Sequence, residues 1–424
     1  MFPYNFLNKK DINSRKIKKL FEESVNLEFL DKELIVDYQK KKIKSLLKLI
    51  GDIPFYSQYL KSSLQPMEVL QRLPIVDKKI ILDNFELMQN KNSSQKFEEI
   101  NTSGTSGTKG RFIRTEDCRL KWFAHTLKIW VQNNVNIEKK HAFIINRLSK
   151  DPRKNKSYFV NLIKNCNHVA LSISCDLDFQ IKWLKKEKPS YLTTFPTNLE
   201  HMFNKGYTPE AEHIFTYGEP FNRDFQKEFE SQTKIKITDF YSTTEAGIIA
   251  QQCEYGNYHI NSDNYFVEIL KNQNEKIKNG ADEAVITVFS NQTLPLIRYN
   301  IGDYVYKKDE QEICECGRKS DFFNSIIGRK NDRLHSKTKK EIWANDIINY
   351  LRKIKTIKKF QITQNKAGNI TINYVALRVL GENNIKNIKQ KMKGIIDNNI
   401  KIKQVRNIER EESGKFPLIK REFN

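Results

Sequence analysis

The feature that most constrains the fold is an alternation of short apolar runs with amphipathic stretches between residues 118 and 242. The stretches Leu120–Gln132 and Asp178–Lys186 have the apolar spacing of helices with one buried face. Strands that alternate with helices predict a largely parallel sheet with helices on both faces. In such sheets, ligands bind beyond the carboxyl ends of the strands. The apolar runs that we expect to form these strands are Ala142–Ile145, Val169–Ile173, Tyr191–Phe195, Ile214–Tyr217 and Ile235–Phe240.

The segments on either side of this region have different patterns. The first hundred residues are typical of helices joined by short turns, and Asp77 stands where a helix would be capped. Between residues 258 and 306 the apolar residues alternate, as in Tyr265–Leu270 and Ala284–Phe289, which predicts antiparallel β structure. Together with the parallel sheet, these segments predict a large N-terminal domain over residues 1–327 that includes a β subdomain.

Residues 328–424 have the pattern of a separate, small and mobile α+β domain. We expect a helix, two strands joined by a turn, a second helix and a short strand. These elements are Ile347–Ile354, Phe360–Thr363, Ile370–Val375, the apolar face from Ile385 to Ile396, and a strand near Ile400–Val405. The predicted fold class is therefore α/β, with the small domain following the large one.

Composition narrows the class of protein. The chain has 424 residues, 38% hydrophobic and 29% charged, which is typical of a globular protein of two or three domains. Lys and Arg exceed Asp and Glu by 22, which predicts either a solvated basic surface or affinity for anions. The basic residues are not gathered into a tail or one helix, so we expect no nucleic-acid partner. Since the sequence shows no export signal or membrane span, and its six cysteines are mostly scattered, we expect a cytoplasmic protein without disulfides.

A polar loop between residues 101 and 110 has the composition of an anion-binding site. Its glycines allow the backbone N–H groups to approach an anion, and its hydroxyls add donors. A triphosphate suits such a loop, although the spacing is not that of a Walker motif and the loop could be a flexible linker. The residues that we expect to contact phosphates are Thr102, Ser103, Gly104, Thr105, Ser106 and Gly107.

Four further segments combine polar groups suited to a nucleotide. Asp239–Glu245 ends a predicted strand and offers an aromatic ring, hydroxyls and a carboxylate for a base, phosphates and Mg²⁺, or simply a strand end with capping residues. Leu296–Asp303 places a carboxylate after a glycine turn, where it can accept both ribose hydroxyls. Gly328–Asp332 stands at the predicted domain junction, and Ser413–Phe416 carries a lysine that would otherwise be an ordinary surface residue.

In this order, these five segments resemble the adenylate-forming superfamily of acyl-CoA ligases and peptide-synthetase adenylation domains. The branch they most resemble is the phenylacetate–CoA ligase family, including its capsule-biosynthesis-type relatives. The resemblance covers nearly the whole chain. Further marks of that branch are Ile53-Pro54-Phe55-Tyr56, Leu73-Pro74-Ile75 and Tyr217-Gly218-Glu219-Pro220.

The resemblance implies a role for each matching residue. Gly218, Glu219 and Pro220 border the adenine, with Tyr241 stacking near it in the segment that includes Asp239 and Ser242. Thr244 contacts the α-phosphate and Glu245 binds Mg²⁺. Asp303 holds the ribose, assisted by Arg329. Lys415 is the lysine of the C-terminal domain that offsets charge while the carboxylate attacks the α-phosphate.

The sequence also departs from the family pattern. Lys109 and Gly110 replace the usual Pro and Lys, and Asn331 replaces the acidic residue more usual at the hinge. The segment Ser336–Glu341 lacks the glycine found in relatives, near part of the site for the second step. These departures leave the prediction of adenylation intact and weaken the prediction of a thiol acceptor.

Four residues form a candidate metal site. Cys253 and His259 precede Cys314 and Cys316, and three cysteines with one histidine are a complete ligand set for structural zinc. The spacing is not that of a standard finger, so four reduced side chains near a β hairpin are the alternative. Some members of the resembled branch carry similar residues at these places.

We therefore expect an AMP-forming ligase that uses ATP and Mg²⁺ to activate a carboxylic acid and transfers the acyl group to coenzyme A. One alternative is transfer to an amine, a hydroxyl or a carrier protein in polysaccharide or secondary-metabolite biosynthesis. Another is a nucleotide-binding relative without catalysis, against which Glu245, Asp303 and Lys415 argue.

The resemblance also suggests a homodimer. Phe195, Phe215 and Tyr217 could line the acyl pocket or belong to the core.

Overall fold

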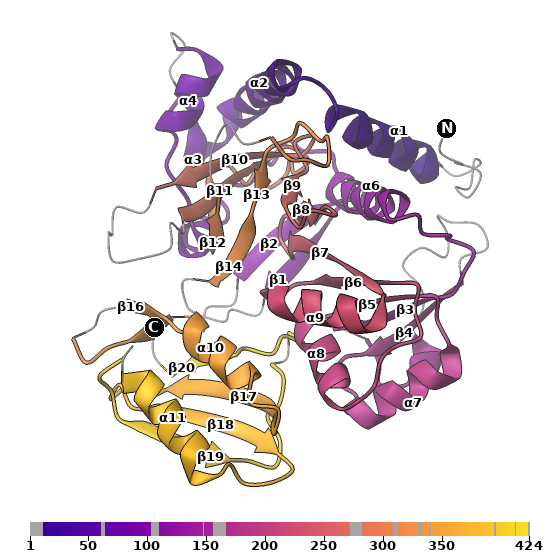
Figure 1. Cartoon of the computed structure of the whole chain (residues 1–424). Helices are drawn as coiled ribbons and strands as arrows, with labels where there is room; N and C mark the ends of the chain where they lie inside the picture. Colours follow the sequence, from indigo (N-terminus) through magenta and orange to yellow (C-terminus); the bar gives the residue numbers. More distant parts are fainter. Residues whose placement is uncertain are drawn as a thin grey trace.

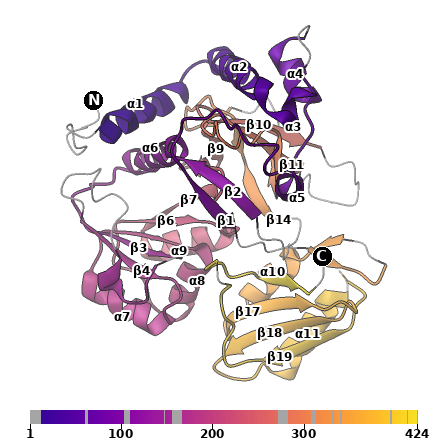
Figure 2. The same ribbon diagram turned by 180° about the vertical axis from the view of Figure 1, so that it is seen from behind.

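The structure is a computed structural model (Figure 1). It describes residues 12–60, 64–102, 110–146, 148–155, 167–271, 282–307, 313–329, 333–338, 341–393, 396–411 and 413–422. Figures 1 and 2 show a large body that ends near residue 329, followed by a smaller α/β part beside α8.

The largest sheet has eight strands in the order β13-β9-β8-β7-β6-β5-β3-β4. Its parallel strands confirm the five predicted from the apolar runs: β3 (His141–Ile145), β4 (His168–Ser172), β5 (Tyr191–Thr194), β6 (His213–Tyr217) and β7 (Lys236–Thr243). Three antiparallel strands extend the sheet beyond β7: β8 (Gly247–Gln252), β9 (Tyr258–Ile260) and β13 (Phe322–Phe323).

Helices pack on this sheet as the alternating pattern predicts. The amphipathic stretches become α6 (Glu116–Gln132) and α7 (Leu177–Glu187), whose N-caps Thr115 and Asp176 accept backbone hydrogen bonds. The sequence pattern did not reveal α8 (Pro196–Asn204), because the helix is short and most of its polar residues are buried rather than solvated. The remaining elements of this region are α9 (Arg223–Thr233) and the short turn η3 (Pro152–Lys154).

The first hundred residues are mostly helical, as predicted. Asp77 caps α5, since its side chain accepts a hydrogen bond from Ile80 N at 2.8 Å. The elements are α1 (Ile12–Leu27), α2 (Lys32–Leu49), η2 (Ile50–Asp52), α3 (Pro54–Ser57), α4 (Pro66–Arg72) and α5 (Lys78–Asp83). An antiparallel hairpin follows, of β1 (Phe97–Thr102) and β2 (Gly110–Thr115).

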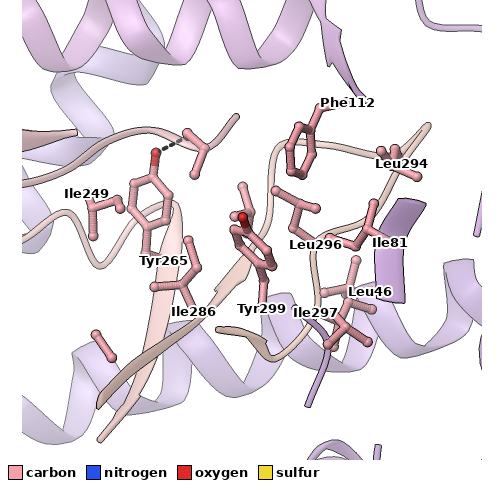
Figure 3. Close-up of a cluster of buried hydrophobic side chains, with 14 of the residues drawn as sticks. Leu46, Ile81, Phe112, Ile249, Tyr265, Ile286, Leu294, Leu296, Ile297 and Tyr299 are labelled. Atoms are coloured by element: carbon pink, nitrogen blue, oxygen red, sulfur yellow. Dashed lines mark hydrogen bonds between the residues drawn. The ribbon is translucent and has the colours of Figure 1, made fainter. Parts of the chain in front are cut away.

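The predicted antiparallel segment forms a second sheet, in the order β10-β11-β12-β14. Its strands are β10 (Tyr265–Leu270), β11 (Asp282–Val288), β12 (Tyr299–Tyr306) and β14 (Ser325–Arg329). The main core lies between this sheet and the N-terminal helices (Figure 3). In it, Tyr265 and Tyr299 pack among Leu46, Ile286 and Leu296, and the Tyr265 hydroxyl donates to Ala246 O at 2.5 Å. Since this core joins residues more than 200 positions apart in sequence, it fixes the second sheet against the first.

The C-terminal residues have a hydrophobic core of their own, made of residues 334–419. It includes the predicted helices α10 (Asn345–Arg352) and α11 (Glu382–Lys393) and a sheet in the order β19-β18-β17-β20. The predicted hairpin is β17 (Ile357–Gln364) with β18 (Ile370–Ala376), and the predicted last strand is β19 (Ile400–Gln404). Two short elements were not predicted: the hairpin β15 (Arg333–His335) with β16 (Glu341–Trp343), and β20 (Ile419–Arg421), which pairs in parallel with β17.

Within the described residues, no helix is long and apolar enough to cross a membrane.

Three histidines lie at the amino ends of the parallel strands, opposite the ligand-binding edge. His141, His168 and His213 begin β3, β4 and β6. The His141 and His213 rings bond to threonine hydroxyls at 2.8 and 2.9 Å, and the His141 and His168 rings are 5.7 Å apart. Burial lowers the pKa of His168 and His213 to about 4 each, and lowers that of His141 well below its ordinary value. The fold therefore favours neutral imidazoles.

This row of histidines predicts loss of stability in acid. Because the folded-state pKa values lie below the unfolded value of about 6.5, the unfolded chain binds more protons between about pH 4 and 6.5. Stability should be complete above about pH 6.5 and should fall as the pH approaches 4. In thermal melts from pH 7 to 5, His213→Gln should lose less stability than the unaltered protein, because glutamine can bond to Thr238 and takes up no proton. Equal slopes would contradict this prediction.

Candidate active site

Two predicted nucleotide motifs meet at the carboxyl edge of the parallel sheet. Strands β6 and β7 are parallel neighbours with Tyr217 opposite Phe240, so Gly218–Pro220 and Tyr241–Glu245 follow adjacent strand ends. Gly218 has φ +80°, and a Cβ there would lie 3.2 Å from the Phe195 ring. A glycine is required because the backbone turns sharply in contact with an aromatic ring.

The Glu219 carboxylate connects three segments at this edge. Its Oε2 accepts from Thr197 N at 3.0 Å and from Thr197 Oγ1 at 2.6 Å, in the first turn of α8. Its Oε1 accepts from Phe416 N at 2.6 Å and from Arg410 Nη1 at 3.1 Å. Both carboxylate oxygens are thus occupied by groups within the chain, and an adenine contact at residue 219 remains a prediction.

The second sheet contacts both the residues predicted to hold ribose and the residue predicted to hold metal. The Tyr241 hydroxyl donates to Asp303 Oδ2 at 2.6 Å, which joins the end of β7 to β12. Asp303 is directly opposite Arg329 in the β12–β14 pairing, so the backbones of the two residues predicted to hold the ribose are neighbours. The Arg329 side chain lies outside the described part. Glu245 Oε1 accepts from the Tyr299 hydroxyl at 3.0 Å.

The remaining residues of the Asp239–Glu245 segment differ in exposure. Ser242, Thr244 and Glu245 are half-buried at the turn between β7 and β8, so the segment links two strands and caps no helix. Asp239 is buried: its oxygens accept from Thr216 at 2.6 Å and from Tyr258 at 2.9 Å. Burial raises the pKa of Asp239 to about 8. This carboxyl group joins β6, β7 and β9, and a nucleotide contact by it remains a prediction.

The predicted phosphate loop joins the two strands of the β1–β2 hairpin. Thr102 pairs with Gly110 as the last pair of the ladder. Ser103, Gly104, Thr105, Ser106 and Gly107 lie outside the described residues, as does the Thr102 side chain.

The segment around Lys415 lies against residues that follow three of the parallel strands. We call residues 411 and 413–416 the lysine loop. Gly414, at φ +80°, fits so closely that a Cβ would lie 2.8 Å from both Asn146, which follows β3, and Ile173, which follows β4. Asn146 Nδ2 donates to Ser413 O at 2.7 Å, and Glu219 follows β6. A loop so placed lies where α/β sheets bind their ligands.

Sequence reasoning did not find Arg410 or the contacts of Glu219 with the lysine loop. Arg410 forms an ion pair with Glu219, and their side chains are 14% and 3% exposed. The available signal was an arginine five residues before Lys415, which one charged residue among many does not reveal.

Aromatic rings form a stack at the same edge. Tyr217 stacks on Phe240 with ring centroids 5.2 Å apart, and on Phe195 at 5.1 Å. Phe215 instead stacks on His213 at 4.7 Å and belongs to the core at the amino ends. Of the three aromatic residues considered for an acyl pocket, only Phe195 and Tyr217 lie at the edge with the nucleotide motifs.

The predicted metal ligands converge between the end of β8, strand β9 and the segment before β13. The ligand atoms of Cys253, His259, Cys314 and Cys316 all lie within 4.8 Å of one another. Cys253 Sγ is 3.7 Å from Cys314 Sγ, and Cys316 Sγ is 3.2 Å from His259 Nε2. A tetrahedron with Zn–S bonds of ~2.3 Å has sulfur–sulfur edges of about 3.8 Å, so the spacing fits zinc.

The surroundings of the four side chains also suit a metal. His259 Nδ1 is 3.3 Å from Ser320 Oγ, which orients the ring so that Nε2 faces the sulfurs. Tight turns present the cysteines, since Gly256 N donates to Cys253 O and Gly317 N to Cys314 O. The residues present therefore fit a structural zinc ion.

Sequence comparisons point to capsule-type relatives. Residues 334–422 match the family model of the CapK C-terminal domain. Over 358 residues the chain is 24% identical to Protein CapK of Staphylococcus aureus, an alignment that covers 80% of this chain and 78% of that protein.

Solved structures share the fold. 2-Hydroxyisobutyryl-CoA ligase in the postadenylation state matches with a TM-score of 0.72 and 15% identity over 99% of this chain and 94% of that chain. The same ligase in its thioesterification state gives 0.59 and 16% identity over 100% and 95%. O-Succinylbenzoate CoA synthetase of Bacillus subtilis gives 0.52 and 12% identity over 81% and 75%. The chain therefore has the fold of the adenylate-forming acyl-CoA ligases, as the sequence motifs predict, and residues 334–422 are similar to the CapK C-terminal domain.

Proposed function

We propose that this protein activates a carboxylic acid with ATP and transfers the acyl group to a second acceptor. In the first step, a carboxylate oxygen attacks the α-phosphorus, the bond to the bridging oxygen breaks, and pyrophosphate leaves. In the second, a nucleophile attacks the carbonyl carbon of the acyl-adenylate, loses its proton, and releases AMP. The relatives with this fold include ligases bound to acyl-AMP and to CoA.

The observation that carries the proposal is the position of the lysine loop. The loop contacts residues that follow β3, β4 and β6. Strand β7 is the neighbour of β6, and its Tyr241 donates a hydrogen bond to Asp303. A cation delivered there would meet the developing negative charge of the α-phosphate. The higher TM-score with the postadenylation structure than with the thioesterification structure is consistent with an arrangement for the first step.

The residue roles follow from this arrangement. Lys415 offsets charge in the transition state, and Thr244 contacts the α-phosphate. Glu245 would hold Mg²⁺, which would supply positive charge to neutralise the phosphates. Asp303 and Arg329 hold the ribose, while the β1–β2 loop holds the outer phosphates.

The acceptor that we propose is the thiol of coenzyme A. Residues 328–424 hold 24 Lys and Arg against 9 Asp and Glu, so +15 of the net charge of +22 belongs to this segment. A basic surface that swings toward the acyl-adenylate suits an acceptor with phosphate groups. An acidic carrier protein fits the same charge, so it is the second candidate acceptor.

We also propose structural zinc at Cys253, His259, Cys314 and Cys316. A metal there would fix the segment before β13 to the end of β8. The phenylacetate–CoA ligase-like subtype, a cytoplasmic location and a homodimer are expectations that accompany the resemblance.

The proposal predicts AMP and pyrophosphate as the products of ATP. Purified protein should be screened against carboxylic acids with labelled ATP, each with and without coenzyme A. The right acid should release pyrophosphate, and coenzyme A should accelerate turnover if it is the acceptor. Formation of ADP and phosphate would show that the chemistry is not adenylation.

Lys415→Ala should separate the two half-reactions. Adenylate formation should fall by about 10²-fold or more, the scale of one lost charge contact in the transition state. Transfer from pre-made acyl-adenylate should stay near normal if the C-terminal part rotates between steps. Lys420→Ala is the matched control, because Lys420 is an exposed lysine of the adjacent β20 and should change neither rate. Equal loss of both half-reactions in Lys415→Ala would exclude the alternating arrangement.

The zinc site predicts about one zinc per chain in protein purified without added metal. Cys316→Ser should lower both the zinc content and the melting temperature, since it removes one of four ligands. Cys175→Ser should keep the metal, because Cys175 lies outside the cluster. Metal-free protein of undiminished stability, measured by elemental analysis and thermal melts, would rule the site out.

A further inference from the structure

Arg410 contacts both the lysine loop and the N-terminal part of the chain. Its Nη1 donates to Gly414 O at 3.0 Å and to Glu219 Oε1 at 3.1 Å. Its Nη2 donates to Thr197 Oγ1 at 3.0 Å. One planar guanidinium thus bridges the loop carbonyl next to Lys415, the carboxylate after β6 and the first turn of α8.

The loop itself is closed by backbone hydrogen bonds. Glu411 N donates to Lys415 O at 2.9 Å, and Gly414 N donates to Glu411 O at 2.8 Å. Phe416 N donates to the Glu219 oxygen that also accepts from Arg410. A displacement of Arg410 would therefore move a rigid turn that carries Lys415, and its effect would reach the lysine backbone directly.

We infer that Arg410 is a positioning residue for adenylation, which holds Lys415 at the carboxyl edge of the sheet through Glu219 and Thr197. This inference rests on the proposed function and assigns it a residue that the sequence motifs do not include. Arg410 does not touch the reacting atoms. Its ion pair forms when the loop is seated, and it breaks when the C-terminal part turns for the second step.

A second ion pair between the two parts provides a comparison. Arg352 of α10 lies 3.1 Å from Glu200 of α8, and these side chains are 19% and 10% exposed. This pair is similarly buried and also joins the C-terminal part to α8, but within the described residues the hydrogen bonds of Arg352 go to Glu200 and not to the lysine loop. If Arg410 only helped the two parts to associate, loss of either pair should have a similar effect.

The test compares Arg410→Gln with Arg352→Gln in the full chain, with the acid identified by pyrophosphate release. Arg410→Gln should slow adenylate formation by about 10- to 100-fold, the scale expected when a catalytic group is misplaced by about 1 Å. Transfer from pre-made acyl-adenylate should change less than about threefold, because the second step does not use the seated loop. Arg352→Gln should change both rates less than about threefold. Arg410→Lys should recover only part of the rate, since an ammonium cannot bridge three acceptors in one plane.

Hydrogen exchange gives a readout that does not depend on turnover. The amide of Phe416 should exchange faster in Arg410→Gln than in the unaltered protein, and should be unchanged in Arg352→Gln. If the unaltered protein adenylates no acid, the proposed function fails. The exchange measurement would still show whether Arg410 holds the lysine loop in place. Equal rates in Arg410→Gln and the unaltered protein, or equal losses in both variants, would overturn the inference.

Discussion

The arrangement of the site depends on the Glu219 carboxylate. One of its oxygens bonds to Thr197 at the start of α8, where a helix terminus favours negative charge, and the other bonds to the lysine loop. The carboxylate thus connects the parallel sheet, a buried helix and the last segment of the chain. Because both oxygens are occupied by donors and the side chain is only 3% exposed, removing a donor by mutation while the loop is seated would leave a buried charge short of partners.

Further contacts bring motifs that are distant in sequence close together in the fold. The parallel sheet fixes the ends of β6 and β7 side by side, and Tyr241 reaches from β7 to Asp303 of the second sheet. The second sheet is held by the core in which Tyr265 and Tyr299 are buried, and Tyr299 also bonds to Glu245. The groups proposed for ribose, metal and α-phosphate therefore stand on strands or on the turn between β7 and β8, whereas Lys415 is carried by a loop of the C-terminal part.

Much of the fold was predictable from sequence. The parallel strands, the antiparallel segment, the cap at Asp77 and the order of elements after residue 340 follow from periodicity and local hydrogen bonding, which neighbouring residues determine. The grouping of Cys253, His259, Cys314 and Cys316 was predictable, because three cysteines and one histidine are recognisable by residue type as a candidate zinc site. Helix α8 was not predictable, because its polar residues are buried against partners that the local sequence does not reveal, such as Gln180 for Asn198 and Arg352 for Glu200. Arg410 and the second contact of Glu219 were not either, because their meaning depends on a pairing across 191 residues.

The chemistry of the interface between the two parts suits a contact that must open. It includes two ion pairs, Arg410–Glu219 and Arg352–Glu200, with Phe416 edge-on to His201 as a smaller apolar contact. An extensive apolar interface would stabilise one arrangement in proportion to the area it hides from water. Charged groups regain hydration when they separate, so the net free energy of such a pair is small compared with its direct attraction. Directional hydrogen bonds to Glu219 can therefore fix where the lysine loop sits while leaving the seated state easy to abandon. This combination is what an enzyme needs if one domain serves two successive half-reactions.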